Sequence, residues 1–119
     1  MVNAEVIIVT DSGLEISSII TLGSCIRMNL EPGEKVVAVI KASSVLVAVG
    51  DSLIISARNN VRGTVKKIIS GMVSDEVVIE AEGIELVSVI TKASVERMGL
   101  KEGTTVSALI KASNVILMK

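Results

Sequence analysis

The sequence contains no histidine and no aromatic residue, and it has one cysteine and one proline among 119 residues. It also lacks a Gly-x-x-x-x-Gly-Lys-Ser/Thr phosphate loop, a Gly-x-Ser-x-Gly elbow and a Cys-x-x-Cys pair. Because these patterns supply many of the bases, nucleophiles and ligands of hydrolytic, redox and metal sites, we expect no enzyme, no cofactor and no coordinated metal cation. The single Cys25 has no partner for an intrachain disulfide, so its expected role is packing.

The balance of charge argues against two further classes of partner. Twelve basic and thirteen acidic residues leave a net charge of −1, so the field of the whole molecule does not attract a polyanion. A nucleic-acid-binding domain normally offers aromatic platforms and a basic groove. No apolar run approaches the roughly 20 residues that span a bilayer, and the first residues do not follow the pattern of a signal peptide. We therefore expect a soluble, cytoplasmic protein without nucleic-acid or membrane partners.

The residues that are abundant are those of β-sheets. Half of the sequence is hydrophobic, and 19 valines and 16 isoleucines supply most of this content. Branched side chains suit a pleated, half-buried surface. A module of about 65 residues buries only a modest core, so each such module needs a neighbour.

The chain contains an internal repeat whose first copy lacks its beginning. Residues 1–49 align with residues 72–119 once one extra residue is allowed in a turn of the first copy, and 22 of the 48 aligned pairs are identical. No residues of the first copy correspond to 53–71. We therefore expect one and a half modules, with an incomplete first module at 1–50 and a complete second module at 51–119.

The complete copy has the pattern of five strands and one short helix. The strands are expected at 63–70, 76–80, 85–91, 105–110 and 114–118, and the helix at 93–100, with Ser94 as a possible cap and Gly99 at its left-handed end. The first copy repeats strands two to five at 5–9, 14–21, 35–40 and 45–49, with a helix at 24–30. A helix between the third and fourth of five strands is the order of an OB-type barrel, so the predicted class is all-β with tandem OB-fold modules.

The missing first strand predicts an unpaired edge in the first module. Edges rich in valine and isoleucine recruit other strands. Exchange or addition of the segment 53–71 between chains would cover this edge and give a symmetric oligomer. Alternatively, Met1 is an internal methionine, and a longer natural product supplies the strand upstream. The sequence leaves both explanations open.

Small hydrogen-bond donors recur at matching places in the two copies. Thr91 and Ser94 flank the end of the third strand and Lys111-Ala112-Ser113 forms a tight turn between the fourth and fifth, while Thr21 with Ser24 and Lys41-Ala42-Ser43 repeat both groups. Ser56-Ala57-Arg58-Asn59 precedes the first strand of the complete copy. Hydroxyl, guanidinium, ammonium and amide groups all donate, as a fully ionised tetrahedral oxyanion requires.

Each of these groups also has a purely structural explanation. The threonine and serine pairs are also typical helix caps, the lysines are also typical of solvated turns, and Arg58 and Asn59 could position the loop before Gly63. Acidic pairs such as Asp75 with Glu76 fall on strand ends, where solvated carboxylates are ordinary. The recurrence of the donors favours an anion site, although copies of one ancestor share residues in any case.

At these residues the chain resembles the molbindin family, the molybdenum-pterin-binding or Mop domain of the wider TOBE group. The resemblance is carried by Ser56-Ala57-Arg58-Asn59 with Gly63-Thr64-Val65, by Val89-Ile90-Thr91-Lys92-Ala93-Ser94 and by Ile110-Lys111-Ala112-Ser113. It implies OB-fold modules in trimeric or hexameric homo-oligomers that bind molybdate or tungstate between subunits, for storage, homeostasis or sensing. No residue here could stack on a pterin, so the pterin of the older family name is not expected.

The resemblance also implies which residues hold the oxyanion. Ser56, Ala57, Arg58 and Asn59 would donate from one module, and Thr91, Ser94, Lys111, Ala112 and Ser113 from its partner. Thr21, Ser24, Lys41, Ala42 and Ser43 would do the same for the first copy, which lacks its own Ser-Ala-Arg-Asn segment. A rigid pocket would reject sulfate by size, because the smaller dianion leaves donors underpaired.

Two alternatives remain at this point. Similar modules form the ligand-sensing part of molybdate-responsive transcription regulators and the tail of oxyanion transport ATPases, so the chain could be a fragment of either. A nucleic-acid-binding OB domain would share the barrel but lacks support from the composition.

Overall fold

The computed structural model describes residues 2–51 and 54–119, and these residues form an all-β protein with two short helices. Met1, with the open question of its origin, and residues 52 and 53 lie outside the described residues. The first repeat contributes β1 (Asn3–Val9), β2 (Glu15–Thr21), α1 (Leu22–Arg27), β3 (Val37–Ile40), the 3-10 turn η1 (Ala42–Ser44) and β4 (Leu46–Ala48). The second contributes β5 (Asn59–Ile69), β6 (Ser74–Ala81), β7 (Ile84–Thr91), α2 (Lys92–Met98), β8 (Thr105–Ile110), η2 (Ala112–Asn114) and β9 (Val115–Met118). The predicted OB-type class is confirmed.

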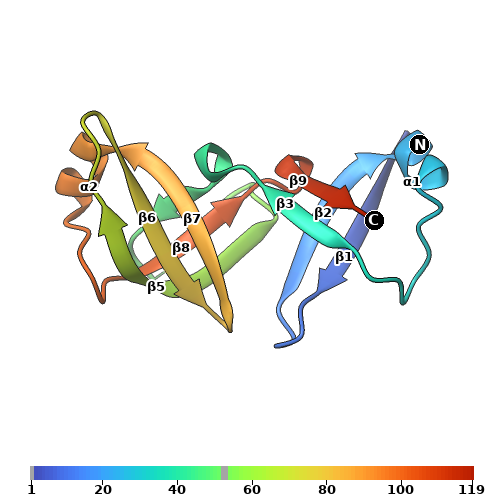
Figure 1. The fold of residues 1–119 in the computed structure, drawn as a ribbon, viewed down its shortest axis with the longest axis horizontal. Helices are drawn as coiled ribbons and strands as arrows, with labels where there is room; N and C mark the ends of the chain where they lie inside the picture. Colours follow the sequence, from blue (N-terminus) through green and yellow to red (C-terminus); the bar gives the residue numbers. More distant parts are fainter. Residues whose placement is uncertain (1, 52–53) are drawn as a thin grey trace.

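The strands pair across the two repeats, which gives the molecule its architecture. A five-stranded sheet has the order β4-β8-β5-β6-β7, so β4 of the first repeat extends the sheet of the second. In return, β9 of the second repeat pairs with β3 of the first, in the register Val37–Met118 to Ile40–Val115. Each repeat therefore gives its last strand to the other. Figure 1 shows this crossing at the middle of the molecule, where β3 and β9 run side by side.

The exchange also determines how the Lys-Ala-Ser turns connect their strands. A tight turn between the fourth and fifth strands suggests a hairpin, but β3 and β4 do not pair with each other, and neither do β8 and β9. Each turn is a single 3-10 turn that redirects the chain into the neighbouring module. Two matching hydrogen bonds fix the crossing: the Ser18 hydroxyl donates to the Val115 carbonyl at 2.7 Å, and the Ser88 hydroxyl donates to the Val45 carbonyl at 2.5 Å.

The core of the second module is built by strands that alternate between inward and outward side chains. Val77 and Ile79 of β6 are 0 % exposed, and so are Val106, Ala108 and Ile110 of β8. Strand side chains point to opposite faces in turn, so these positions form one continuous inner face. The β5 strand lies between β6 and β8 in the sheet and adds Val61 and Val65, which are 3 % and 2 % exposed, to the core.

Both helices begin earlier than the sequence pattern predicts. We expected them at 24–30 and 93–100, with Ser94 as a possible cap. In the structure Thr21 and Thr91 are the N-caps, and their side chains accept hydrogen bonds from the backbone of Ser24 and Ser94. The serines therefore occupy the third helical position. Gly99 adopts the left-handed conformation at the end of α2, as predicted (φ 65°).

The first module lacks the strand that would separate β1 from β3. Among the described residues, β1 pairs only with β2, and β3 pairs only with β9. The unpaired edge expected from the sequence is therefore present in the described residues, and two strands contribute to it, because β1 and β3 each leave one edge unpaired. The two modules together form an elongated molecule of 44 × 27 × 26 Å (Figure 1). No described helix combines the length and apolarity that crossing a membrane requires.

Candidate functional site

The paired threonine and serine of each repeat form the same small hydrogen-bonded group. In the first repeat the Thr21 hydroxyl lies 2.9 Å from the Ser24 hydroxyl, and the Arg27 guanidinium donates to that serine at 2.9 Å. In the second, Thr91 and Ser94 are 2.8 Å apart and Arg97 lies 3.5 Å from the serine. Both groups sit at the exposed ends of β2 and β7. They act as helix caps, and the arginines add a positive charge that the sequence analysis did not single out.

The Lys-Ala-Ser turns present an exposed lysine on either side of the crossing. Lys41 and Lys111 precede the two 3-10 turns, and their backbone carbonyls accept from the amides of Ser44 and Asn114 at 2.8 and 2.9 Å. The lysine side chains are exposed, whereas Ala112 is 4 % exposed and anchors its turn. Ser43 and Ser113 are exposed beside them. The second turn is thus anchored by a buried alanine, whereas Ala42 of the first is partly exposed, and both turns expose their lysine and following serine.

Strand exchange determines which of these groups come together within one chain. The η1 turn, with Lys41-Ala42-Ser43, lies against β7, the strand that ends at Thr91. The η2 turn, with Lys111-Ala112-Ser113, lies against β2, which ends at Thr21. The family resemblance places Thr91 and Ser94 in one site with Lys111-Ala112-Ser113. Within a single chain, however, Lys111-Ala112-Ser113 lies beside β2, and β7 lies beside the turn of the first repeat.

The Ser56-Ala57-Arg58-Asn59 segment lies where the second repeat meets the first. Asn59 is 4 % exposed, and its amide side chain accepts from the Ser17 backbone N–H at 2.8 Å and donates to the Ser17 carbonyl at 2.9 Å. The Arg58 Nε atom lies 3.2 Å from the Glu5 carboxylate, which also accepts from the Ser17 hydroxyl at 2.5 Å. Ser56 is exposed and Ala57 half-buried. Both this segment and η2 therefore contact the first repeat at β2.

Some residues of this region were not identified from the sequence. Glu5 and Ser17 bind Arg58 and Asn59, and Ser18 and Ser88 hold the crossing. A signal for the last two was present, because a serine recurs at the same buried position of β2 and β7. No such signal marks Glu5, since its contact depends on how the repeats are placed.

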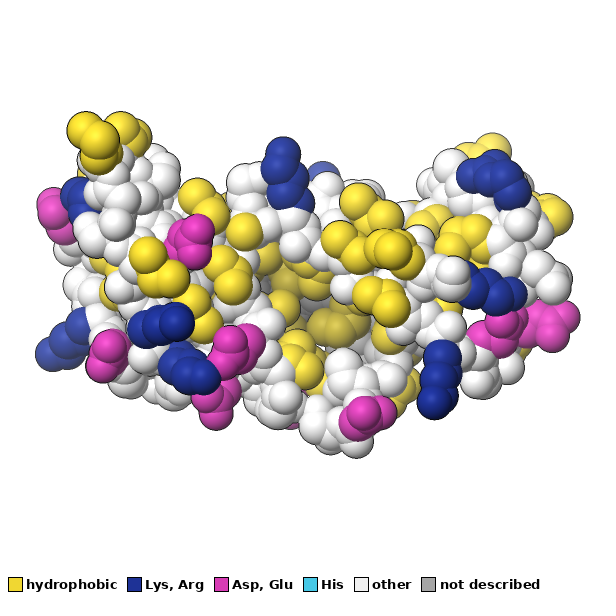
Figure 2. All heavy atoms as spheres, in the orientation of Figure 1, with side chains coloured by type: hydrophobic (Ala, Val, Ile, Leu, Met, Phe, Trp, Pro, Cys, Tyr) yellow, Lys and Arg dark blue, Asp and Glu magenta, His cyan; other side chains and the backbone are white. Residues whose placement is uncertain are grey.

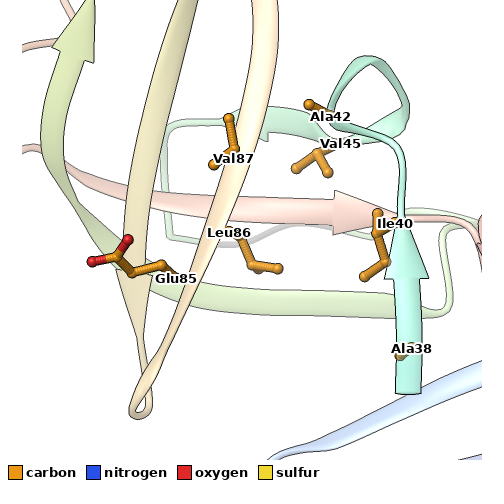
Figure 3. A pocket seen from close by; sticks show the side chains of 7 residues that line it. All are labelled: Ala38, Ile40, Ala42, Val45, Glu85, Leu86 and Val87. Atoms are coloured by element: carbon orange, nitrogen blue, oxygen red, sulfur yellow. The ribbon is translucent and has the colours of Figure 1, made fainter.

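A partly open cavity nearby does not have the side chains of an anion site. It has a volume of about 250 Å³ and lies between β7 and the β3–η1 segment (Figure 3). The side chains that line it are apolar except for that of Glu85, whose carboxylate points away from β3 in Figure 3 and pairs with Lys66. The hydrogen bond from Lys66 lowers the pKa of Glu85 below its usual value, so this carboxylate is charged and would repel an anion. The described residues also contain no cluster of three or more histidine, cysteine or acidic side chains for a metal ion.

Fold and donors together define a class: tandem OB-like modules that exchange a strand and present lysine, hydroxyl and guanidinium groups without a metal-ligand cluster. The chain belongs to the TOBE domain family, whose model matches residues 2–47 and 55–117, and the resemblance to its Mop group is confirmed. The cytoplasmic molybdate-binding protein ModG, in a crystal form with molybdate bound, has a TM-score of 0.93 and 44% identity, over 98% of this chain and 84% of that chain.

Two curated proteins are similar along almost the whole chain. The molybdenum-pterin-binding protein MopA of Rhodobacter capsulatus is 40% identical over 118 residues, which are 98% of this chain and 44% of MopA. The molybdenum transport protein ModE of Azotobacter vinelandii is 37% identical over 117 residues, 98% of this chain and 43% of ModE. The chain thus spans less than half the length of these relatives.

Proposed function

We propose that this chain binds molybdate, or its close analogue tungstate, as a reversible cytoplasmic store, buffer or sensor, without catalysing a reaction. The observation that carries the proposal is the combination of 44% identity to a molybdate-bound protein with the donor groups that recur in both repeats. The sites are expected between modules of a homo-oligomer, as a trimer or hexamer. The assignment of individual residues to those sites stays a prediction.

The donor chemistry supports a fully ionised oxyanion as the ligand. Lys41, Lys111 and Arg58 carry positive charge, and the serine and threonine hydroxyls can each donate once. Hydrogen bonds from charged donors to an anion are shorter and roughly twice as strong as neutral ones. Because the net charge of the chain is −1, long-range attraction contributes little, and affinity has to come from these local contacts.

Selectivity would come from size rather than charge. Sulfate and molybdate are both tetrahedral dianions, but the metal oxyanion is larger. In a rigid site built for the larger ion, sulfate would leave donors unpaired, and each buried unpaired donor costs about 1–3 kcal/mol. Equal affinities for sulfate and molybdate in calorimetric titrations would contradict this selectivity.

The residue assignment is tested by Arg58→Ala and Lys111→Ala, with Lys101→Ala as the matched control. Lys101 is an exposed turn lysine outside the donor groups. Losing a charged hydrogen bond of about 1.5–3 kcal/mol should weaken molybdate binding roughly 10- to 100-fold in each site variant and leave the control unchanged. Isothermal titration measures affinity, and sedimentation checks that the oligomer is intact. Unchanged affinity in both site variants would reject the assignment.

A second role is supported by the similarity to ModE, which extends over 98% of this chain. In that role the chain would be the ligand-sensing part of a longer regulator or of a transport ATPase. Both roles use the same anion site. They differ in the polypeptide that carries it, so the mass of the natural gene product distinguishes them.

A further inference from the structure

The strongest unexplained feature is an open cleft between β1 and β3. In the second repeat β5 lies between β6 and β8 and pairs with both. The equivalent strands of the first repeat, β1 and β3, border a cleft of about 1230 Å³, which also touches the turn before β7 at Gly83 and Ile84. Figure 2 shows hydrophobic side chains gathered in the hollow at the middle of this face. The cleft occupies the place of one strand.

Corresponding residues on the two sides of this strand position are more exposed in the first repeat than in the second. In the second repeat, five apolar residues of the two strands that flank β5 are 0 % exposed: Val77, Ile79, Val106, Ala108 and Ile110. Their first-repeat counterparts Val6, Ile8, Val36, Ala38 and Ile40 are all partly exposed. All five pairs are identical residues. The same inner face is therefore present twice, but only in the second repeat does a central strand complete it.

Polar groups at the crossing point to the same missing partner. Asn59 at the start of β5 binds both backbone groups of Ser17 in β2. The residue that corresponds to Ser17 is Val87 in β7, and no side chain among the described residues bonds to its backbone in this way. Val87 instead borders the cavity of about 250 Å³ (Figure 3). An asparagine that matched Asn59 would reach the backbone of Val87 from the β3 side.

An exposed carboxylate of the second repeat could pair with the same added strand. Arg58 pairs with Glu5 at the edge of β1. The counterpart of Glu5 is Glu76 in β6, which is exposed and has no ion-pair partner among the described residues. An arginine one residue before the matching asparagine would face this carboxylate. A strand that fits the cleft therefore needs a basic residue, then an asparagine, and then alternating apolar residues.

We propose that the cleft binds an additional β-strand with the residue pattern of 56–69, antiparallel to both β1 and β3. Its asparagine would lie opposite Ile40, as Asn59 lies opposite Ile110, and its counterpart of Val65 opposite Ile8, as Val65 lies opposite Ile79. This is strand addition to two sheet edges at once. It goes beyond anion binding and does not depend on it.

The occupant is a strand supplied in addition to β5 and not the β5 of a second copy. Each chain has one β5 and two positions that such a strand can fill. An exchange of β5 between chains fills one cleft and opens another, so it cannot complete both modules of every chain in an assembly. The cleft therefore selects a second segment with this residue pattern, in addition to the β5 of each chain.

The test uses a synthetic peptide of residues 56–70 and the full chain without molybdate. Calorimetry should give one peptide per chain. Hydrogen exchange should slow at least 10-fold for the amides of 6–9 and 36–40 and change little in β6 and β8. A control peptide with Asn59→Ala and Val65→Asp should bind at least 10-fold more weakly, because it loses the asparagine contact and places a charge in the core.

A second variant gives a test that does not depend on the affinity of a free peptide. A copy of residues 55–71 placed directly before Met1 makes the addition intramolecular, which raises the effective concentration to the millimolar range. The same amides should become protected and the melting temperature should rise. The proposal is overturned if neither the peptide nor the extension protects β1 and β3. It is also overturned if these amides are already protected in an oligomer of the free chain, because a second copy then covers the cleft. Neither result bears on molybdate affinity, which is measured separately.

Discussion

Single buried polar residues fix how the two repeats meet. Asn59 and Ser18 are 4 % and 0 % exposed, and each bonds to the backbone of the other repeat. Every buried side-chain nitrogen or oxygen among the described residues has a partner. A buried polar group that loses its partner costs more free energy than the hydrogen bond itself contributes. These contacts therefore favour one placement of the strands over others of equal hydrophobicity.

Replacing Asn59 by alanine should destabilise the chain by roughly 1–3 kcal/mol, because the buried N–H and C=O of Ser17 would lose their partners. The measurement is urea denaturation followed by circular dichroism in the far ultraviolet. Asn60→Ala is the matched control, since Asn60 is the exposed neighbour in the same strand, and it should change the midpoint little. Equal effects of the two substitutions would contradict the role given to the Asn59 side chain.

Asp75 should make stability depend on pH in the acid range. The Gly71 backbone N–H donates to its carboxylate at 3.1 Å, and the Lys92 ammonium lies 3.1 Å away; these contacts hold the pKa of Asp75 below its usual value. The folded state therefore binds the carboxylate's proton less readily than the unfolded state. The stabilisation is present above about pH 4 and is lost as pH falls through the lower, folded pKa.

The check on Asp75 is the difference between two melting curves. Asp75→Asn should melt below the parent chain at pH 7, and the difference in melting temperature should narrow as the pH falls below about 4 and the parent carboxylate is protonated. Asp11→Asn, in an exposed turn, serves as the control. A gap that stays constant with pH would mean that the contacts of Asp75 act through shape and not through its charge.

At the scale of elements, Gly63 shows why one strand position tolerates no side chain. A Cβ atom built on Gly63 would lie 2.4 Å from the Glu80 carbonyl oxygen and 2.8 Å from the Ala81 Cβ atom. Both contacts are shorter than real Cβ atoms make, and the first is with backbone that cannot rotate away. The glycine lies inside β5, two residues before the register shift between Val65 and Lys67. It lets β5 cross closely over β6 as the barrel bends.

Gly63→Ala should therefore cost about 1–3 kcal/mol, the range for inserting atoms into a packed interior. Gly23→Ala is the control, because nothing lies within 4 Å of its Cβ position and it sits in α1, where alanine is the better helix former. The control should be neutral or slightly stabilising. Chemical denaturation of both variants gives the comparison, and a neutral Gly63→Ala would show that β5 can move away from β6 at little cost.

The elements themselves were largely predictable from the sequence, whereas their pairing was not. Alternating apolar residues predicted β8 at its observed bounds and placed β7 within one residue, and the cap pattern placed both helices within three residues. The exchange could not be predicted, because the inner residues of β3 and β8 are the same, so β4 and β9 match either strand. Of the candidate site, the recurring donors were visible in the repeat. The Arg58–Glu5 contact was not, since it depends on the crossing.

At the scale of the whole molecule, the exchange makes the two repeats one folding unit. The last strand of each module belongs to the other repeat, so neither repeat contains all the strands of its own sheet. Val45, directly before β4, and Val115, the first residue of β9, are both 1 % exposed. The binding of an anion beside these crossings would therefore depend on the folding of both repeats. A strand bound in the open cleft would stabilise the same folding unit.

Substitution of Val115 by alanine tests this coupling. Val115 belongs to the second repeat, but its carbonyl binds Ser18 and its strand pairs with β3, both in the first. Loss of two buried methyl groups should cost roughly 2 kcal/mol. If the repeats fold as one unit, denaturation stays a single transition that shifts as a whole, and hydrogen exchange accelerates in β2 as well as in β8. Ile116→Ala, at an exposed position of the same strand, should shift it much less. Two separate transitions, with β2 unaffected, would show that the modules fold independently despite their exchanged strands.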